Sequence, residues 1–294
     1  MKKLVIYGVG CGLGNRLLTI ASALAYAKKT DRKLEMIWHT GGTATIRKLS
    51  HCECKFEKLF NNDFFLKDVE DYKFYIKESE VSYEEFCTGN MWKRRFRGKN
   101  IEYVGDEHDV EFYNVNCVKN VHPPCDQCAD IGFELNQENN NIAKYTKEIH
   151  EALNLLTPKS EILKRVITLD DNTIGVHIRR TDFVGNTTDG RPQVNLSIYE
   201  DIIFKEIQSG KKIYLCSDDG KLKQKLKKQY EDKIHIYDFG YTENFSSVRA
   251  EQGVMDALVE ILTLKNTSKI YHTKTSSFAY LPAVWGNIEL ISLK

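Results

Sequence analysis

The chain has 294 residues, which at ~100–200 residues per domain predicts two domains or one large one. Hydrophobic residues make up 41% and charged residues 28%, a globular composition that excludes disordered, collagen-like and coiled-coil chains. The 42 basic and 41 acidic side chains leave a formal net charge of +1. We therefore expect no nucleic acid partner, although a pocket for one phosphate group stays open.

The amino-terminal residues predict a strand, a turn, a helix and a second strand. Residues 4–7 are apolar, residues 8–15 are rich in glycine, residues 16–29 have helical apolar spacing, and residues 33–38 form the next apolar run. This order predicts a parallel sheet. The glycines fit neither a dinucleotide fingerprint nor a P-loop. They either let backbone approach a ligand at the helix amino terminus or only make a tight turn.

No segment has the pattern of an export signal or a membrane span. The first apolar run has four residues, whereas a signal peptide needs ~7–15. No run approaches the ~18–20 apolar residues that cross a bilayer. We expect a cytoplasmic protein, for which peripheral contact with a membrane stays open.

Residues 40–145 are rich in aromatic side chains, and their elements cannot be placed from the sequence. Helices are expected at residues 145–156 and 159–166. A domain boundary near 155–165 divides the chain into domains of residues 1–160 and 161–294.

Eight cysteines raise the question of a metal site. Two pairs, Cys52 with Cys54 and Cys125 with Cys128, offer four sulfur ligands for a structural zinc ion. The first pair has only one intervening residue, and about 70 residues separate the pairs, so free thiols are the main expectation.

The second half alternates strands and helices, as a doubly wound α/β domain requires. Strands are expected at residues 173–178, 212–216, 234–237 and 269–272. Helices are expected at residues 197–208, 220–230 and 253–264, and from residue 276. The lysine run in the helix over 220–230 is interpreted as a solvated face.

Two arginines follow the first of these strands. Arg179 and Arg180 sit where ligands bind in open α/β sheets, outside the carboxyl ends of the strands. A guanidinium fits phosphate oxygens bidentately. Asp182 would orient one arginine and leave the other for an anion; the alternative is a purely structural ion pair.

Polar clusters follow two further strands. Asp218 and Asp219 either accept from ribose or base groups or cap the next helix. Thr275, Ser276 and Ser277 either bind an anion or serve as an ordinary cap. Arginines, carboxylates and hydroxyls at three strand ends together favour a nucleoside diphosphate ligand.

Four motifs in these positions resemble those of GT-B fucosyltransferases. Residues 175–182 contain the His-x-Arg-Arg-x-Asp motif, and residues 214–219 and 258–278 resemble the second and third shared motifs. Residues 10–17 are similar to the amino-terminal glycine loop of the same family. The family comprises the α-1,2-, α-1,6- and protein-O-fucosyltransferases. The extension after the first motif most resembles the α-1,6 group, which includes the nodulation enzymes.

The resemblance implies two Rossmann-like domains that face a central cleft, with acceptor binding on the first domain and nucleotide-sugar binding on the second. It implies an inverting transfer of fucose from GDP-fucose to a hydroxyl of an oligosaccharide or glycolipid. Neither a metal nor another cofactor is expected. The resemblance also implies a role in glycan biosynthesis.

The resemblance also assigns roles to residues. Arg179 would bind the β-phosphate and stabilise the leaving GDP, and His177 would contact the nucleotide. Asp218 or Asp219 would read guanine or ribose, and Ser276 and Ser277 would hold phosphate oxygens. The matched motifs add further substrate-binding candidates: Gly14, Asn15, Arg180, Asp182, Ser217, Thr275 and Phe278.

The sequence departs from the family pattern in two places. The α-1,6 enzymes carry a glutamate shortly after the first motif as the expected base, whereas this chain has a threonine at the nearest position. Asp189 would substitute only if it reaches the acceptor hydroxyl, at ~3 Å or through a water. The aspartate expected before the third motif is Glu260 here.

Three alternatives to a fucosyltransferase stay open. The same fold would serve a different nucleotide-sugar donor. The missing glutamate allows a noncatalytic relative that binds a nucleotide sugar or a glycan. The cysteine pairs allow a zinc-dependent binding module.

Overall fold

The computed structural model describes residues 3–8, 12–38, 52–62, 74–76, 101–103, 110–114, 146–180, 195–238, 250–273 and 276–293. The chain forms two compact units. The first contains residues 1–159 with 249–254, and the second contains residues 160–248 with 255–294. Each unit has a parallel sheet of its own.

The first unit is built on the strand–helix–strand segment that the sequence predicts. β1 (Lys3–Gly8) pairs in parallel with β2 (Lys33–Trp38) and with β5 (Val110–Asn114), in the order β2-β1-β5. The helix between the first two strands, α1 (Leu13–Thr30), ends at Asp31, which has a left-handed conformation. The other elements in the described part of this unit are α2 (Phe56–Leu59), α5 (Thr146–Leu153), and the antiparallel pair β3 (Phe74–Ile76) and β4 (Ile101–Tyr103).

The second unit contains a five-stranded sheet in which every pairing is parallel. Its strands are β6 (Thr173–Ile178), β7 (Lys212–Ser217), β8 (Ile234–Ile236), β9 (Lys269–Thr273) and β10 (Glu289–Leu293). Its helices are α6 (Ser160–Leu163), α7 (Leu196–Gln208), α8 (Gly220–Tyr230), α9 (Glu251–Leu264, from Met255 onward) and α10 (Ser277–Gly286), with a 3-10 turn at Glu231–Lys233.

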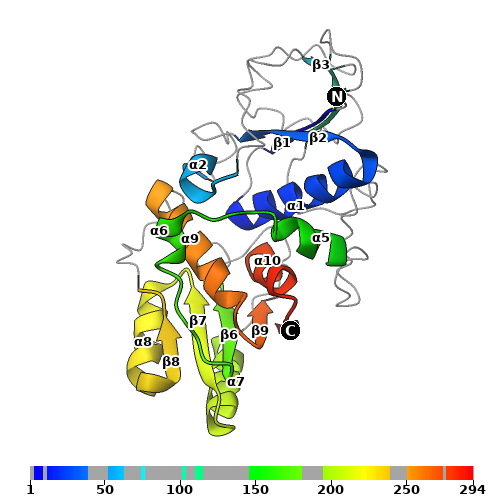
Figure 1. The fold of residues 1–294 in the computed structure, drawn as a ribbon. Helices are drawn as coiled ribbons and strands as arrows, with labels where there is room; N and C mark the ends of the chain where they lie inside the picture. The colour runs from blue at the N-terminus through cyan, green and yellow to red at the C-terminus, as the bar shows by residue number, and fades with distance from the viewer. Residues whose placement is uncertain are drawn as a thin grey trace. The chain divides into compact units, whose positions relative to one another are not determined.

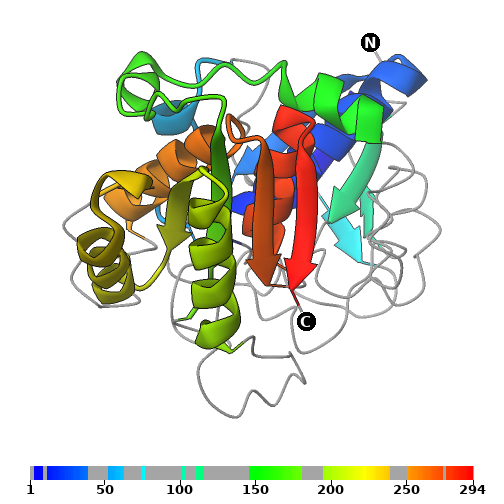
Figure 2. The same ribbon diagram turned by 90° about the horizontal axis from the view of Figure 1, so that it is seen from below.

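The strand order is β10-β9-β6-β7-β8. The chain builds β6, β7 and β8 outward in one direction and then returns to place β9 on the other side of β6, as Figures 1 and 2 show. This is the strand order of a Rossmann-like sheet. The order in which strands are added reverses between β6 and β9, while the strands stay parallel.

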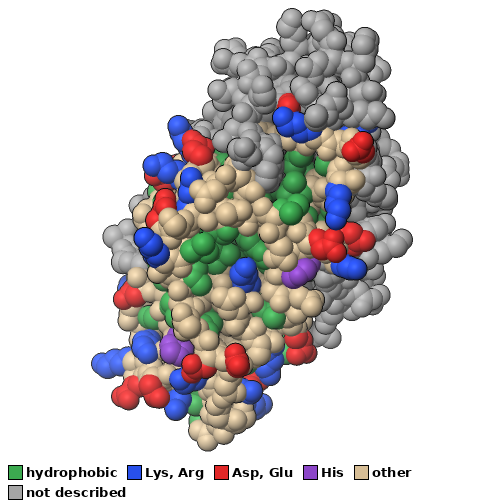
Figure 3. Space-filling view, viewed as in Figure 1, with side chains coloured by type: hydrophobic (Ala, Val, Ile, Leu, Met, Phe, Trp, Pro, Cys, Tyr) green, Lys and Arg blue, Asp and Glu red, His purple; other side chains and the backbone are tan. Residues whose placement is uncertain are grey.

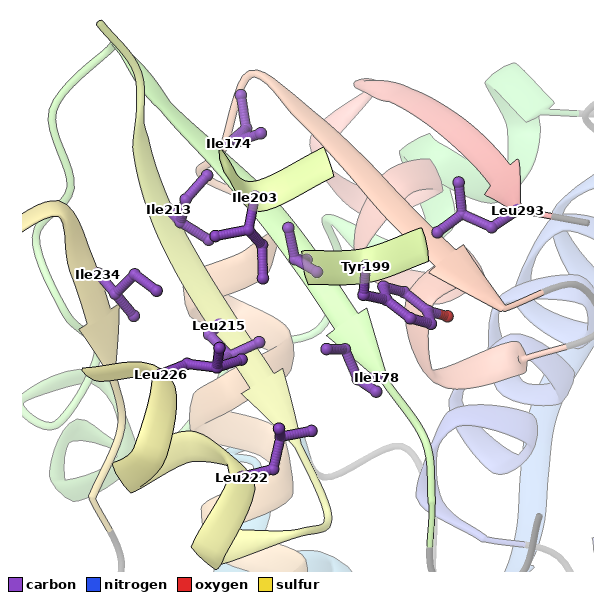
Figure 4. Packing of buried hydrophobic residues seen from close by; sticks show 11 residues of the cluster. Ile174, Ile178, Tyr199, Ile203, Ile213, Leu215, Leu222, Leu226, Ile234 and Leu293 are labelled. Carbon is purple, nitrogen blue, oxygen red and sulfur yellow. The ribbon is translucent and has the colours of Figure 1, made fainter. Parts of the chain in front are cut away.

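Alternation along the strands creates two apolar layers. Figure 4 shows the first, in which Ile213 and Leu215 of β7 pack with side chains of α7 and α8 such as Ile203 and Leu226. Tyr214 and Cys216 belong to the second layer, with Leu264 of α9 and Ala279 and Ala283 of α10. Strands buried on both faces are typical of a parallel sheet covered by helices.

Two glycines allow close packing in this unit. A Cβ atom on Gly175 of β6 would lie 2.9 Å from Leu264 Cδ2 and 3.0 Å from Thr267 Oγ1. A Cβ atom on Gly286, the last residue of α10, would lie 2.2 Å from the carbonyl oxygen of Lys265. These positions fix α9 and α10 against the sheet and against each other.

The structure confirms the α/β class and most predicted elements of the second half. The strand at 173–178 and the helix at 220–230 have the predicted bounds. The helix predicted at 159–166 is wrong in length, since α6 spans only Ser160–Leu163. β10 was not predicted, and α10 continues through Pro282.

Two surface properties agree with the composition. Within the described ranges, none of the helices is both long and apolar enough to cross a membrane. On the face drawn in Figure 3, basic and acidic side chains of the described residues are interspersed. That mixed surface fits the near-zero net charge.

Candidate functional site

Three strand ends of the second unit lie at one edge of its sheet, because the strands are parallel. His177, near the end of β6, is in register with Cys216 of β7 and with His272 of β9. The switch point of the sheet lies between β6 and β9, where ligands bind in folds of this kind. The residues that follow these strands therefore define the candidate site.

The β7–α8 junction, residues 217–220, satisfies its own polar groups. The side chain of Asp219 is the N-cap of α8 and accepts from the N–H of Leu222 at 3.0 Å. The hydroxyl of Ser217 accepts from the N–H of Asp219 at 3.1 Å. Of the two interpretations for this acidic cluster, the cap is therefore present in the structure.

The acidic junction also holds Arg180. The N–H of Arg180 donates to Asp218 Oδ1 at 2.7 Å, and its Nε lies 3.2 Å from Asp219 Oδ2. The two side chains of this ion pair are 36% and 30% exposed. Asp182, the partner that the sequence suggested for an arginine, lies outside the described residues.

The β9–α10 junction, of which residues 276–278 are described, is built differently. Ser276 occupies the N-cap position of α10 but makes no capping hydrogen bond with its side chain. Its hydroxyl is buried and has no partner among the described residues. The first turn of α10 carries no acidic residue. Unsatisfied N–H groups at a helix amino terminus attract an anion.

His177 adds a second buried polar group at this junction. Its ring stacks on Phe278 with centroids 5.1 Å apart and planes 17° apart. Its Nδ1 atom has no hydrogen-bond partner in the described part of the chain. Burial lowers the pKa of His177 to about 3, with further lowering by the positive charges of Arg179 and His272. The imidazole is therefore neutral at neutral pH.

Arg179 follows directly after β6 and is half-buried. Its charge acts on His177 strongly enough to lower the pKa of that imidazole. The structure thus places a neutral imidazole and a serine hydroxyl at the amino terminus of a ten-residue helix, and the charge of Arg179 acts on that imidazole. A buried polar group without a partner is costly, so a ligand that supplies acceptors would stabilise this arrangement.

Sequence reasoning missed a buried ionic network behind the β7–α8 junction. Lys223, expected on a solvated face, is buried and lies 2.8 Å from Glu260 on α9. Burial raises the pKa of Glu260, while Lys223 and a hydrogen bond from Cys216 act in the opposite direction. The only available signal was the place of Lys223 between two apolar positions of the helix, Leu222 and Leu226.

A second ion pair lies on the same helix. Arg165 pairs with Asp256 on α9, and its Nε donates to the hydroxyl of Tyr237 at 2.9 Å. Tyr237 directly follows β8, and its carbonyl accepts from Lys223 at 2.7 Å. The two networks therefore meet at Tyr237.

The first unit contains the glycine loop candidates. Gly12 is the N-cap of α1, so Gly14 and Asn15 lie in the first helical turn and not in a loop before it, which corrects the predicted helix start. Arg16 is buried, with its guanidinium 4.7 Å from the ring centre of Trp38. The backbone of α1 begins earlier than expected because Leu13 and Leu17 are both core residues.

Several predicted site residues lie outside the described residues. These are Asp182, Asp189, Thr275, Cys125 and Cys128. Cys52 and Cys54 are buried, and burial raises the pKa of both thiols. Within the described ranges, no three His, Cys, Asp or Glu side chains are grouped so that they could hold a metal ion.

Neither a protein-family model nor a curated protein matches the sequence. Solved structures do match, and they define the fold as that of GT-B fucosyltransferases. The NodZ α-1,6-fucosyltransferase soaked with GDP-fucose superposes with a TM-score of 0.56 and 15% identity, over 97% of this chain and 93% of that chain. A structure of NodZ from Bradyrhizobium gives 0.55 and 15% over 100% and 95%.

A plant enzyme has the same fold. A variant of Arabidopsis thaliana FUT1 in complex with GDP matches with a TM-score of 0.51 and 16% identity. The match covers 99% of this chain and 70% of that chain. At these identities the likeness concerns the fold, and the chemistry must be argued from the site.

Proposed function

We propose that the protein is an inverting fucosyltransferase that transfers fucose from GDP-fucose to a glycan hydroxyl. The observation that carries the proposal is the β9–α10 junction, where the buried Ser276 hydroxyl and His177 Nδ1 have no partner among the described residues. Both groups lie at the switch point of a Rossmann-like sheet. The fold shared with fucosyltransferase structures that contain GDP-fucose or GDP supports this donor.

The diphosphate is proposed to bind at the amino terminus of α10. Its oxygens accept from the Ser276 hydroxyl and from the first N–H groups of the helix, which carry the positive end of the helix dipole. Because the pKa of His177 is about 3, the imidazole takes part as a neutral group. Its Nδ1 either donates or accepts according to the tautomer.

Arg179 is proposed as the catalytic group that stabilises the leaving GDP. As the acceptor oxygen forms its bond to C1 of fucose, the bond from C1 to the β-phosphate oxygen breaks and its electron pair goes to GDP. A guanidinium held beside the phosphate meets the growing negative charge. Asp189 is proposed to take the proton of the acceptor hydroxyl. With these groups the transfer needs no metal.

The β7–α8 junction is proposed to receive the nucleoside. Asp218 and Asp219 are both candidates for ribose or base: Asp218 Oδ1 accepts from the N–H of Arg180, and Asp219 is engaged with Arg180 and with the helix cap. The proposed acceptor is an oligosaccharide or a glycolipid, reached from the cytoplasm.

A calorimetric donor screen tests the proposal. GDP, GDP-fucose, GDP-mannose and UDP-sugars are titrated with and without EDTA. The proposal predicts GDP and GDP-fucose binding that EDTA does not change. Binding of UDP-sugars alone would support a different donor, and fucose transfer tested on a panel of glycans separates an enzyme from a binding protein. A chain that binds no nucleotide contradicts the proposal.

A pair of hydroxyl variants locates the donor. Ser276→Ala removes a hydrogen bond to a charged phosphate and should weaken GDP binding about 10- to 100-fold. Thr173 also has a buried hydroxyl without a described partner, at the opposite end of β6. Thr173→Val therefore serves as the matched control and should bind GDP like the wild type.

A further inference from the structure

Two ion pairs, of which the Lys223–Glu260 pair is fully buried, meet at Tyr237, the residue that follows β8. Lys223 Nζ lies 2.8 Å from Glu260 Oε1 and donates to the carbonyl of Tyr237 at 2.7 Å. The side chains of Lys223 and Glu260 are 3% and 5% exposed. One ammonium group therefore ties α8, α9 and the end of β8 together.

The second pair holds the other end of the same tyrosine. The hydroxyl of Tyr237 accepts from Arg165 Nε at 2.9 Å and donates to Asp256 Oδ1 at 3.3 Å. Asp256 lies one helical turn before Glu260 on α9. The two carboxylates of α9 thus fix both the backbone and the side chain of Tyr237.

The Lys223–Glu260 pair also reaches the β7–α8 junction. Glu260 accepts a hydrogen bond from the thiol of Cys216, the residue before Ser217. Lys223 lies in the first turn of α8, where its N–H donates to the carbonyl of Asp219 at 3.1 Å. Both sides of the junction that holds Asp218 and Asp219 are therefore tied to one buried ion pair.

Stability alone is a weak reason for such a pair. Removing two charges from water is costly, and apolar residues of similar volume often stabilise a core as well or better. The pair instead fixes the local geometry, because its hydrogen bonds hold the Tyr237 carbonyl, the Cys216 thiol and the first turn of α8 in defined positions. Small displacements of groups that hold a substrate have large effects on its binding.

We infer that Lys223 and Glu260 are positioning residues that hold the β7–α8 junction and Tyr237 in the geometry that receives the nucleoside half of the donor. Glu260 acts through Lys223 and Cys216 and contacts no substrate. The inference rests on the proposed function, because it takes the donor to be a nucleoside diphosphate sugar whose phosphates bind at α10.

The test replaces both charged groups by side chains of similar length. Lys223→Met/Glu260→Met should keep an unfolding midpoint in urea close to that of the wild type. Its Kd for GDP should rise about 10- to 100-fold, whereas its Kd for pyrophosphate, which reports only the α10 side, should not change. The matched control is Lys225→Met/Glu200→Met, which removes a solvent-accessible pair of 3.0 Å between α8 and α7 and should bind both ligands like the wild type.

Two further measurements keep the test decisive. If the double variant fails to fold, Glu260→Gln keeps a side chain that can accept from Cys216 and should show a smaller loss of GDP affinity. Amide hydrogen exchange at residues 217–219 and 237 should accelerate in either variant, whether or not a nucleotide binds. A folded variant with unchanged GDP affinity, or with unchanged exchange at these amides, overturns the inference. A wild-type chain that binds no nucleotide overturns the proposed function instead, and the exchange data still decide the positioning role.

Discussion

At the end of β7 the first turn of α8 is capped by Asp219, whereas at the end of β9 the side chain of Ser276 leaves the first turn of α10 uncapped. Both junctions connect a parallel strand to a helix at the same edge of one sheet. The first is acidic and pairs with Arg180, and the second presents a buried hydroxyl without a described partner.

This difference between the two junctions indicates which of them is suited to bind an anion. A phosphate at α8 would compete with the Asp219 carboxylate for the same N–H groups and would be repelled by its charge. A phosphate at α10 would meet helix N–H groups that no side chain caps and the Ser276 hydroxyl, and the charge of Arg179 acts on the adjacent His177. The acidic junction is suited to hydroxyl or amino groups, which the nucleoside supplies.

Substitution of the two arginines should give the largest effects that test this comparison of the junctions. Arg179→Ala should abolish transfer, with a loss of about 10³-fold or more in kcat, because it removes the charge proposed to stabilise the leaving diphosphate. Arg180→Ala should cost much less, because the Asp219 carboxylate holds its guanidinium. Transfer assays and urea unfolding of both variants check the prediction. Near-normal turnover of Arg179→Ala would contradict the assignment of Arg179 as the catalytic group.

Glycines at the two helices test how each junction is held. Gly286→Ala places a Cβ atom 2.2 Å from the carbonyl oxygen of Lys265 and should lower the free energy of unfolding by about 3 kcal/mol. The shift of α10 should also weaken donor binding. Gly220→Ala meets no atom within 4 Å and should change stability by less than about 0.5 kcal/mol. Equal tolerance of both alanines would refute the close packing of α10.

His177 makes the β9–α10 junction sensitive to acid. Its pKa is about 3 in the fold against 6.5 ordinarily, so the unfolded chain binds more protons between these values. The free energy of unfolding should therefore fall as the pH drops below 6.5, by up to about 1.4 kcal/mol for each pH unit. Above pH 6.5 this contribution stays constant. Urea titrations from pH 7.5 to 5 should show the slope, and His177→Gln should reduce it.

The caps give the smallest and most selective effects. Asp219→Ala removes a satisfied cap and should lower the free energy of unfolding by about 1 kcal/mol. Ser276→Ala removes a hydroxyl that has no described partner and should leave stability unchanged or slightly higher. Thermal unfolding measured beside GDP binding separates the two. A loss of stability in Ser276→Ala, with Asp219→Ala unchanged, would contradict this account of the two caps.

The alternation of apolar runs and turns was sufficient to predict β6, β7, β8 and β9 of the sheet in the second unit. Residues 213–216 are apolar on both faces, and polar clusters follow the strands at 173–178, 212–217 and 269–273. β10 was not predicted because its apolar side chains, Leu290, Ile291 and Leu293, form neither a strict alternation nor a continuous run.

The residue types at the candidate site were predictable, but their pairing was not. Asp218 and Asp219 looked equivalent in sequence, and only the fold shows that Asp219 caps α8 while Asp218 accepts from the backbone of Arg180. Lys223 looked like its solvated neighbours because partners from distant elements leave no local pattern. Glu260 and Tyr237 lie 37 and 14 positions away from Lys223.

The most direct measurement is a pyrophosphate titration followed by backbone amide NMR of the whole chain. The account predicts saturable shifts of the amides of Ser277, Phe278 and Ala279 in α10, and none of comparable size at Lys221 and Leu222 in α8. Shifts at the α8 amides, with those of α10 unmoved, would contradict the assignment of the anion site.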